Sequence, residues 1–176
     1  MFRDWENFYL LIGSGAAALI GLLFVVATLN TGRDRRTALR GASIYLTPVV
    51  FHFAVIVVLS AVAMMPGVIA PAAGGAVGGA GLVGLAVSGL VAVRIRRGDL
   101  LEPVHWSDFW YYGMLPSVLY VGLAAAAACL WAGRQGAINA VGLLLLALML
   151  AGIRNAWDLV TWLAPGRDAT GGTSPE

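Results

Sequence analysis

The sequence predicts an all-α protein, a polytopic transmembrane helical bundle with five spans. Three observations lead to this prediction. Apolar residues make up 60% of the 176 residues and charged residues only 11%, against roughly 25% charged residues in ordinary soluble domains. The apolar residues occur in blocks of about 20, the length at which a helix crosses a hydrocarbon core of roughly 30 Å. The blocks are continuous and do not alternate with polar residues, which argues against a β-barrel.

The blocks define a single transmembrane domain over residues 1–164, followed by a polar tail at 165–176 that is predicted to be disordered. The five predicted spans cover about residues 8–29, 44–64, 72–93, 109–131 and 137–162. In an alternative arrangement there are four spans and the glycine-rich third segment is re-entrant. Pro48 and Pro116 remove backbone donors in the second and fourth spans, so a bend is expected in each.

The arginines predict the orientation of the spans. All 11 basic residues are Arg. Two short segments between spans are rich in them: Arg33, Arg35, Arg36 and Arg40 in the first, and Arg94, Arg96 and Arg97 in the second. Short basic loops mark the cytoplasmic side, which places the N-terminus outside and the C-terminus in the cytoplasm. The net charge of +2 is too small to indicate a nucleic-acid partner.

Small residues spaced four apart form candidate helix-packing surfaces, because they allow two helix backbones to approach closely in a membrane. They occur in the first and third spans: Gly13, Ala17 and Gly21, and the overlapping pairs Gly74/Gly78 and Gly75/Gly79. The interpretation is close packing within the bundle or at an interface with another copy or another membrane protein. Lining of a narrow pore is the alternative.

The spans contain few ionisable or strongly polar side chains. A candidate polar cluster consists of Tyr45, His52, Arg154, Asn155 and Asp158. Arg154 and Asp158 are i,i+4 on a helix, and Asn155 shares their face. An isolated Arg at a helix centre costs about 2.5–3.5 kcal/mol on insertion scales. The second and fifth spans are therefore predicted to be neighbours that join these side chains in the inner leaflet.

Two members of this cluster have more than one interpretation. His52 is either a structural histidine hydrogen-bonded to a neighbouring helix, a proton relay or gate, or a haem ligand. Arg154 is either a structural anchor that reaches the interface with its long side chain or part of the site. The single Cys129 lies within an apolar stretch and is predicted to be a buried small hydrophobe.

Two stretches carry a resemblance to known proteins. Residues 5–25, W-E-N-F-Y-L-L-I-G-S-G-A-A-A-L-I-G-L-L-F-V, and residues 152–164, G-I-R-N-A-W-D-L-V-T-W-L-A, resemble a group of small, uncharacterised bacterial membrane proteins. The resemblance covers both ends of the chain and little of its middle. It implies a multi-span protein of the bacterial inner (plasma) membrane and supplies no activity. The group usually has His where Arg154 stands, so a role for an imidazole at that position does not carry over.

The sequence gives no sign of catalysis. Ser/His/Asp arrangements, HExxH motifs and phosphate-binding loops are missing, and the chain has only two His and one Cys. The prediction is therefore a non-enzymatic membrane protein without a metal or cofactor. Two functional hypotheses follow: a small oligomeric channel or transporter that uses the polar cluster, or a non-catalytic partner or regulator that packs its glycine-rich helices against another membrane protein.

Overall fold

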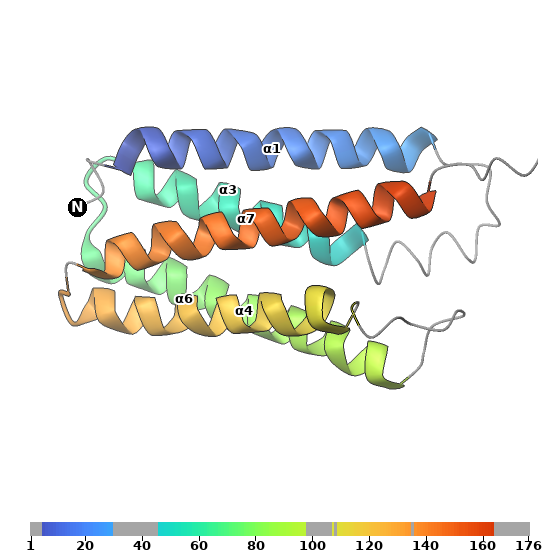
Figure 1. Cartoon of the computed structure of the whole chain (residues 1–176). Helices are drawn as coiled ribbons and strands as arrows, with labels where there is room; N and C mark the ends of the chain where they lie inside the picture. The colour runs from blue at the N-terminus through green and yellow to red at the C-terminus, as the bar shows by residue number, and fades with distance from the viewer. Residues whose placement is uncertain (1–4, 30–45, 98–106, 108, 135, 164–176) are drawn as a thin grey trace, which may run out of the picture.

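The apolar blocks form long helices. The computed structural model describes residues 5–29, 46–97, 107, 109–134 and 136–163. In chain order the helices are α1 (Glu6–Leu29), α3 (Thr47–Met64), α4 (Ala70–Arg97), the π-helix η3 (Phe109–Met114), α6 (Leu115–Trp131) and α7 (Gly136–Leu163) (Figure 1). Within the described residues, five helices are long and apolar enough to cross a membrane, with η3 and α6 counted as one. The all-α, five-span fold class is confirmed.

The third span is a full helix. α4 runs unbroken through 28 residues, so it is not the re-entrant segment of the four-span alternative. It is longer than the predicted 72–93 at both ends. Its last turns include Arg94, Arg96 and Arg97, which the sequence had suggested were loop residues. Basic side chains suit the negative end of a helix dipole, and their long stems let the charge reach the interface from within a helix.

Both prolines lie in the first turn of a helix. Pro48 is in the first turn of α3, where the missing N–H costs no intrahelical bond. Leu46 before it also has helical dihedral angles, and the bend expected at Pro48 stays a prediction. Pro116 is in the first turn of α6, directly after η3. Its ring crowds the preceding turn, and the turn before it is widened into the π-helix.

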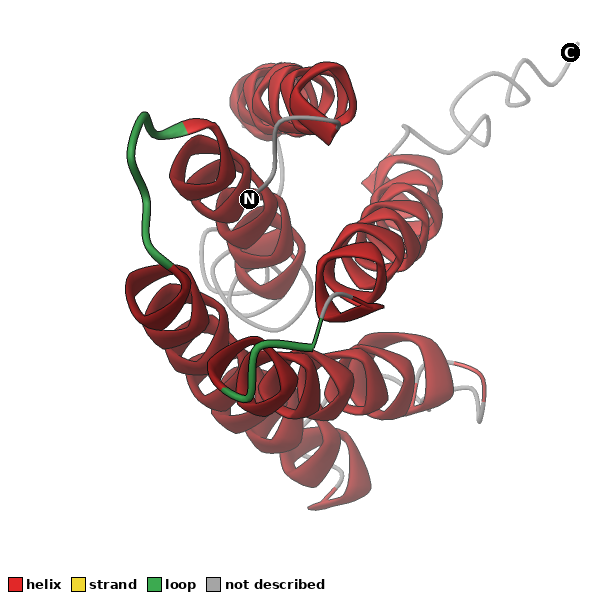
Figure 2. Ribbon diagram, turned by 90° about the vertical axis from the view of Figure 1, so that its left-hand side faces the viewer, coloured by secondary structure: helices red, strands yellow, loops and turns green. Residues whose placement is uncertain are grey.

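The helices form two pairs joined by a fifth helix. α1 packs against α3, α4 packs against α6, and α7 contacts α1, α3 and α6. α3 also contacts α4. Consecutive helices run in opposite directions along a shared axis (Figure 1). Figure 2 looks at the end of the bundle that carries the turns at 65–69 and 132–134.

Glycines set the close contact between α4 and α6. A Cβ at Gly81 would come within 2.9 Å of the backbone nitrogen of Ala124, and a Cβ at Gly84 would overlap the ring of Tyr120. Larger residues at these positions would hold the two helices apart. The close approach therefore depends on the missing side chains.

The predicted packing residues divide into two groups. Gly13, Gly74 and Gly78 lie inside the bundle, where an added Cβ would come within 2.8 Å of Ser60, 2.6 Å of Trp131 and 3.3 Å of Ala127 respectively. The other four face outward: Ala17 is exposed, and nothing in the described structure lies within 4 Å of a Cβ at Gly21, Gly75 or Gly79. One of the two overlapping glycine pairs of α4 is thus used internally and the other is open.

The outer surface is apolar. Large hydrophobic side chains are exposed on every helix, among them Leu11 (70%), Val58 (57%), Leu82 (66%), Val118 (60%) and Leu143 (62%). A water-soluble monomer rarely exposes so continuous an apolar surface. Together with the five helices of spanning length, this surface indicates a membrane protein.

Candidate functional site

The structure places the predicted polar residues on two helices. His52 is on α3, and Arg154, Asn155 and Asp158 are near the end of α7. Tyr45 lies outside the described residues. α3 and α7 are neighbours, as predicted, and they meet closely where the ring of Phe53 lies over Gly152.

His52 is buried and hydrogen-bonded to a helix other than α7. Its side chain is 1% exposed, and its Nδ1 lies 2.8 Å from the hydroxyl oxygen of Tyr120 on α6. Tyr120 is itself fully buried, and its ring fits the space that Gly84 leaves on α4. Three helices, α3, α4 and α6, therefore hold this histidine–tyrosine pair in place.

The other ring nitrogen of His52, Nε2, has no hydrogen-bond partner among the described residues. It is buried, and none of their polar groups lies within hydrogen-bonding reach. A neutral imidazole has one N–H donor and one acceptor nitrogen, and the bond to Tyr120 uses one of them. The remaining nitrogen is a buried polar atom with unused capacity, and such atoms are costly in an apolar interior.

Arg154, Asn155 and Asp158 come together beside η3. A guanidinium nitrogen of Arg154 lies 2.9 Å from a carboxylate oxygen of Asp158, and both side chains are partly exposed, at 38% and 40%. The guanidinium also lies over the ring of Tyr111, 3.4 Å from its centroid. The charge of Arg154 is thus balanced by a carboxylate and a π-face without full burial.

Asn155 holds the π-helix. Its side chain is 1% exposed and Nδ2 donates to the carbonyl of Tyr111 at 3.0 Å, while the hydroxyl of Tyr112 donates to the backbone carbonyl of Asn155 at 2.8 Å. In a π-helix a carbonyl accepts from the N–H five residues on, which for Tyr111 is Pro116, a residue with no N–H. The side-chain amide of Asn155 donates to this carbonyl in place of the N–H that Pro116 lacks.

These contacts arrange the candidate cluster as two groups. One is His52 with Tyr120, and the other is Arg154, Asn155 and Asp158 with the tyrosines of η3. Both groups touch the same continuous segment, because η3 runs directly into α6. The segment from 109 to 131 therefore links the two.

Three tyrosines of this site were missed by sequence reasoning. Tyr111 and Tyr112 belong to the run F-W-Y-Y at residues 109–112, and aromatic residues at the end of a span are typical of the membrane interface. Tyr120 stands alone in an apolar span, and only its phenol signals a polar role. No spacing rule connects any of them to His52 or Asn155, because the partners are on different helices.

The described residues contain no group of three or more His, Cys, Asp or Glu side chains that could hold a metal ion. Comparison of the chain with protein-family models, with curated protein sequences and with solved structures gives no match.

Proposed function

We propose that the protein is a small membrane transport protein, a channel or transporter that moves protons through the bundle by way of His52. One observation carries the proposal: His52 is fully buried within a spanning helix, bonded at Nδ1 to Tyr120 and left without a partner at Nε2 among the described residues. An ionisable side chain inside a membrane is expensive, and it points to a pathway for ions or protons.

The two ring nitrogens are suited to passing a proton. When Nδ1–H donates to the hydroxyl oxygen of Tyr120, Nε2 is an acceptor; when the hydroxyl donates to Nδ1, Nε2 carries the proton. A proton bound at Nε2 followed by release from Nδ1 converts one tautomer into the other. One proton thereby crosses the ring: as the Nδ1 proton passes to the Tyr120 oxygen, the proton already on that hydroxyl leaves for a further acceptor such as a water molecule, so the phenol stays neutral.

The proposal includes a location. We infer a bacterial inner (plasma) membrane with the N-terminus outside and the C-terminus cytoplasmic. The exposed arginines at the end of α4 and Arg154 near the end of α7 support this orientation, because they lie at the same end of the bundle in Figure 1 and basic residues favour the cytoplasmic side. On this proposal the protein is not an enzyme.

Proton flux into liposomes tests the proposal. Purified protein should collapse a pH gradient faster than protein-free liposomes do. The His52→Gln variant, whose amide can still bond to Tyr120 but cannot bind a proton, should return the flux to the protein-free level. Ser14→Ala is the matched control, since the exposed Ser14 bonds only to carbonyls of its own helix. Absence of flux from the wild type, or full flux from His52→Gln, would refute the proposal.

A second candidate function rests on the open glycine pair of α4. Gly75 and Gly79 are exposed and have nothing within 4 Å of an added Cβ, so a second helix could approach there. The role would be that of a non-catalytic membrane partner or of one subunit in a homo-oligomer. Crosslinking in native membranes would distinguish these by yielding either a stoichiometric partner or multiples of the chain itself. Gly79→Leu should abolish whichever crosslinked product the wild type gives. If the wild type and the variant both remain monomers, this role is excluded.

A further inference from the structure

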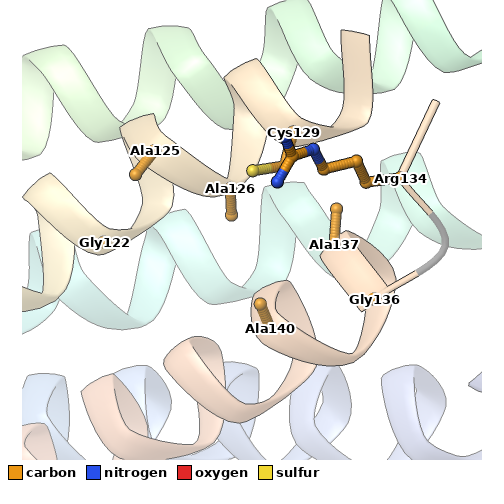
Figure 3. A pocket seen from close by; sticks show the side chains of 8 residues that line it. All are labelled: Gly122, Ala125, Ala126, Cys129, Arg134, Gly136, Ala137 and Ala140. Carbon is orange, nitrogen blue, oxygen red and sulfur yellow. The ribbon is translucent and has the colours of Figure 1, made fainter. Parts of the chain in front are cut away.

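An open groove runs between α6 and α7 near the end of the bundle shown in Figure 2. Its volume is about 430 Å³, and its lining is small side chains with one cysteine and one arginine (Figure 3): Gly122, Ala125, Ala126, Cys129, Arg134, Gly136, Ala137 and Ala140. Larger side chains normally fill the space between packed helices. Here the glycines and alanines of two helices of spanning length leave it open.

The groove has the shape of a slot for a hydrocarbon chain. On α6 its lining extends from Cys129 to Gly122, seven residues or roughly 10 Å along the helix axis. It therefore continues from the helix ends toward the apolar middle of the spans. An acyl chain lying in it would supply the van der Waals contacts that the small side chains leave unmade.

A cation stands at the mouth of the groove. Arg134 lies in the turn between α6 and α7, and its backbone N–H donates to the carbonyl of Cys129 at 3.0 Å. Its side chain reaches back beside Cys129 over the groove (Figure 3). It is exposed, and it makes no ion pair with any residue that the structure describes. The start of α7 at Gly136 adds the positive end of a helix dipole at the same place.

The occupant must therefore combine an apolar tail with an anionic head. We infer that the groove binds an anionic phospholipid, with one acyl chain between α6 and α7 and the phosphate against the guanidinium of Arg134. A guanidinium matches phosphate oxygens with paired, charge-assisted hydrogen bonds. The depth order fits a bilayer, because the cation is at the helix ends, where head groups lie, and the small residues extend inward from it. This inference is independent of the proposed proton transport.

Native mass spectrometry of the purified full chain tests the assignment with phosphatidylglycerol and phosphatidylcholine of equal chain length. The wild type should retain phosphatidylglycerol in preference. Arg134→Gln should weaken phosphatidylglycerol binding about fivefold, the effect of one cation at a lipid surface, and leave phosphatidylcholine binding unchanged. Arg97→Gln is the matched charge control, since Arg97 is exposed at the end of α4. Equal retention of both lipids, or equal loss in the two arginine variants, would overturn the proposal.

Two further measurements test the slot itself. Ala125→Phe fills the groove from an exposed position and should reduce the binding of both lipids, whereas Ala128→Phe, exposed on the same helix but outside the lining, should not. Cys129 is the only thiol in the chain, so its alkylation by N-ethylmaleimide reports on the groove directly. Phosphatidylglycerol should slow this reaction in the wild type, less so in Arg134→Gln. An alkylation rate that is independent of lipid, or lipid binding unchanged in Ala125→Phe, would contradict the assignment.

Discussion

Replacing Asn155 with Ala is expected to lower the free energy of unfolding by about 1–2 kcal/mol. Hydrogen bonds between helices in membranes contribute roughly 0.6 kcal/mol on average and at most about 1.7, and a buried carbonyl left without a donor costs about 1–3. The main bond lost here joins Nδ2 to the carbonyl of Tyr111 at 3.0 Å at a part-buried position, and the longer bond from Arg154 to Oδ1, at 3.4 Å, is lost with it. The bond from Tyr112 goes to the backbone of Asn155 and survives, which keeps the loss moderate. Unfolding in mixed detergent micelles, followed by circular dichroism, measures it.

A double-mutant cycle shows whether the stated cause is right. Pro116→Ala restores an N–H at the position from which a π-helix would serve the Tyr111 carbonyl, so Asn155→Ala should cost about 0.5–1 kcal/mol less in that background. Asn139→Ala, exposed on the same helix, should stay within about 0.5 kcal/mol of the wild type. If the losses from Asn155→Ala and Pro116→Ala simply add, Asn155 does not substitute for the missing donor and the reasoning fails.

Three more outcomes follow from the packing. Gly84→Ala should destabilise the bundle by about 1–3 kcal/mol, because its Cβ overlaps the ring of Tyr120; Gly79→Ala, which meets open space, should not, and equal melting of the two would contradict this difference. Ser60→Ala should be neutral or slightly stabilising in the same unfolding assay, because the buried Oγ has no hydrogen-bond partner among the described residues; a loss above about 1 kcal/mol would reveal one. Arg154→Gln should cost less than about 1.5 kcal/mol, since its ion pair and ring contact are both partly exposed, and the cost should shrink as salt is added.

The number and positions of the helices could be predicted because hydropathy alone sets them. A helix that crosses a membrane must be apolar over its whole width, so each block is visible as a run of residues. The ends were harder. The last turn of α4 includes Arg96, whose charge resembles a loop signal, although the side chain lies over the ring of Phe109 at 5.0 Å from its centroid.

The direction in which each residue faces could not be predicted. In a soluble helix the polar side marks the outside, but a span that is apolar all round carries no such contrast. Gly74 and Gly75 are adjacent and equally small, yet one faces Trp131 and the other faces open space. Cys129 was expected to be buried and is instead partly exposed at a groove, because the small neighbours that open this space are ordinary members of an apolar run.

For the candidate site, the sequence indicated polar side chains on the second and fifth spans, but neither the tyrosines that bond to them nor the pairings. The cost of isolated charge in lipid indicated that Arg154, Asn155 and Asp158 would be shielded. It could not indicate that the shield is a π-helix, because that segment arises from Pro116 acting on the turn before it. The partner of His52 depends on how α3 and α6 are rotated, which is fixed by contacts distant in the chain.

The π-helix has a consequence for register. It holds an additional residue within one turn, and relaxing it to an ordinary α-helix would twist everything before it by about 100° relative to everything after it. Tyr111 and Tyr112 lie within the π-helix, and Tyr120 lies after it in α6. Asn155 holds the π-helix by two bonds: its side-chain amide donates to the backbone carbonyl of Tyr111, and its backbone carbonyl accepts from the hydroxyl of Tyr112. While both bonds last, the phenol of Tyr120 keeps its angle to the π-helix.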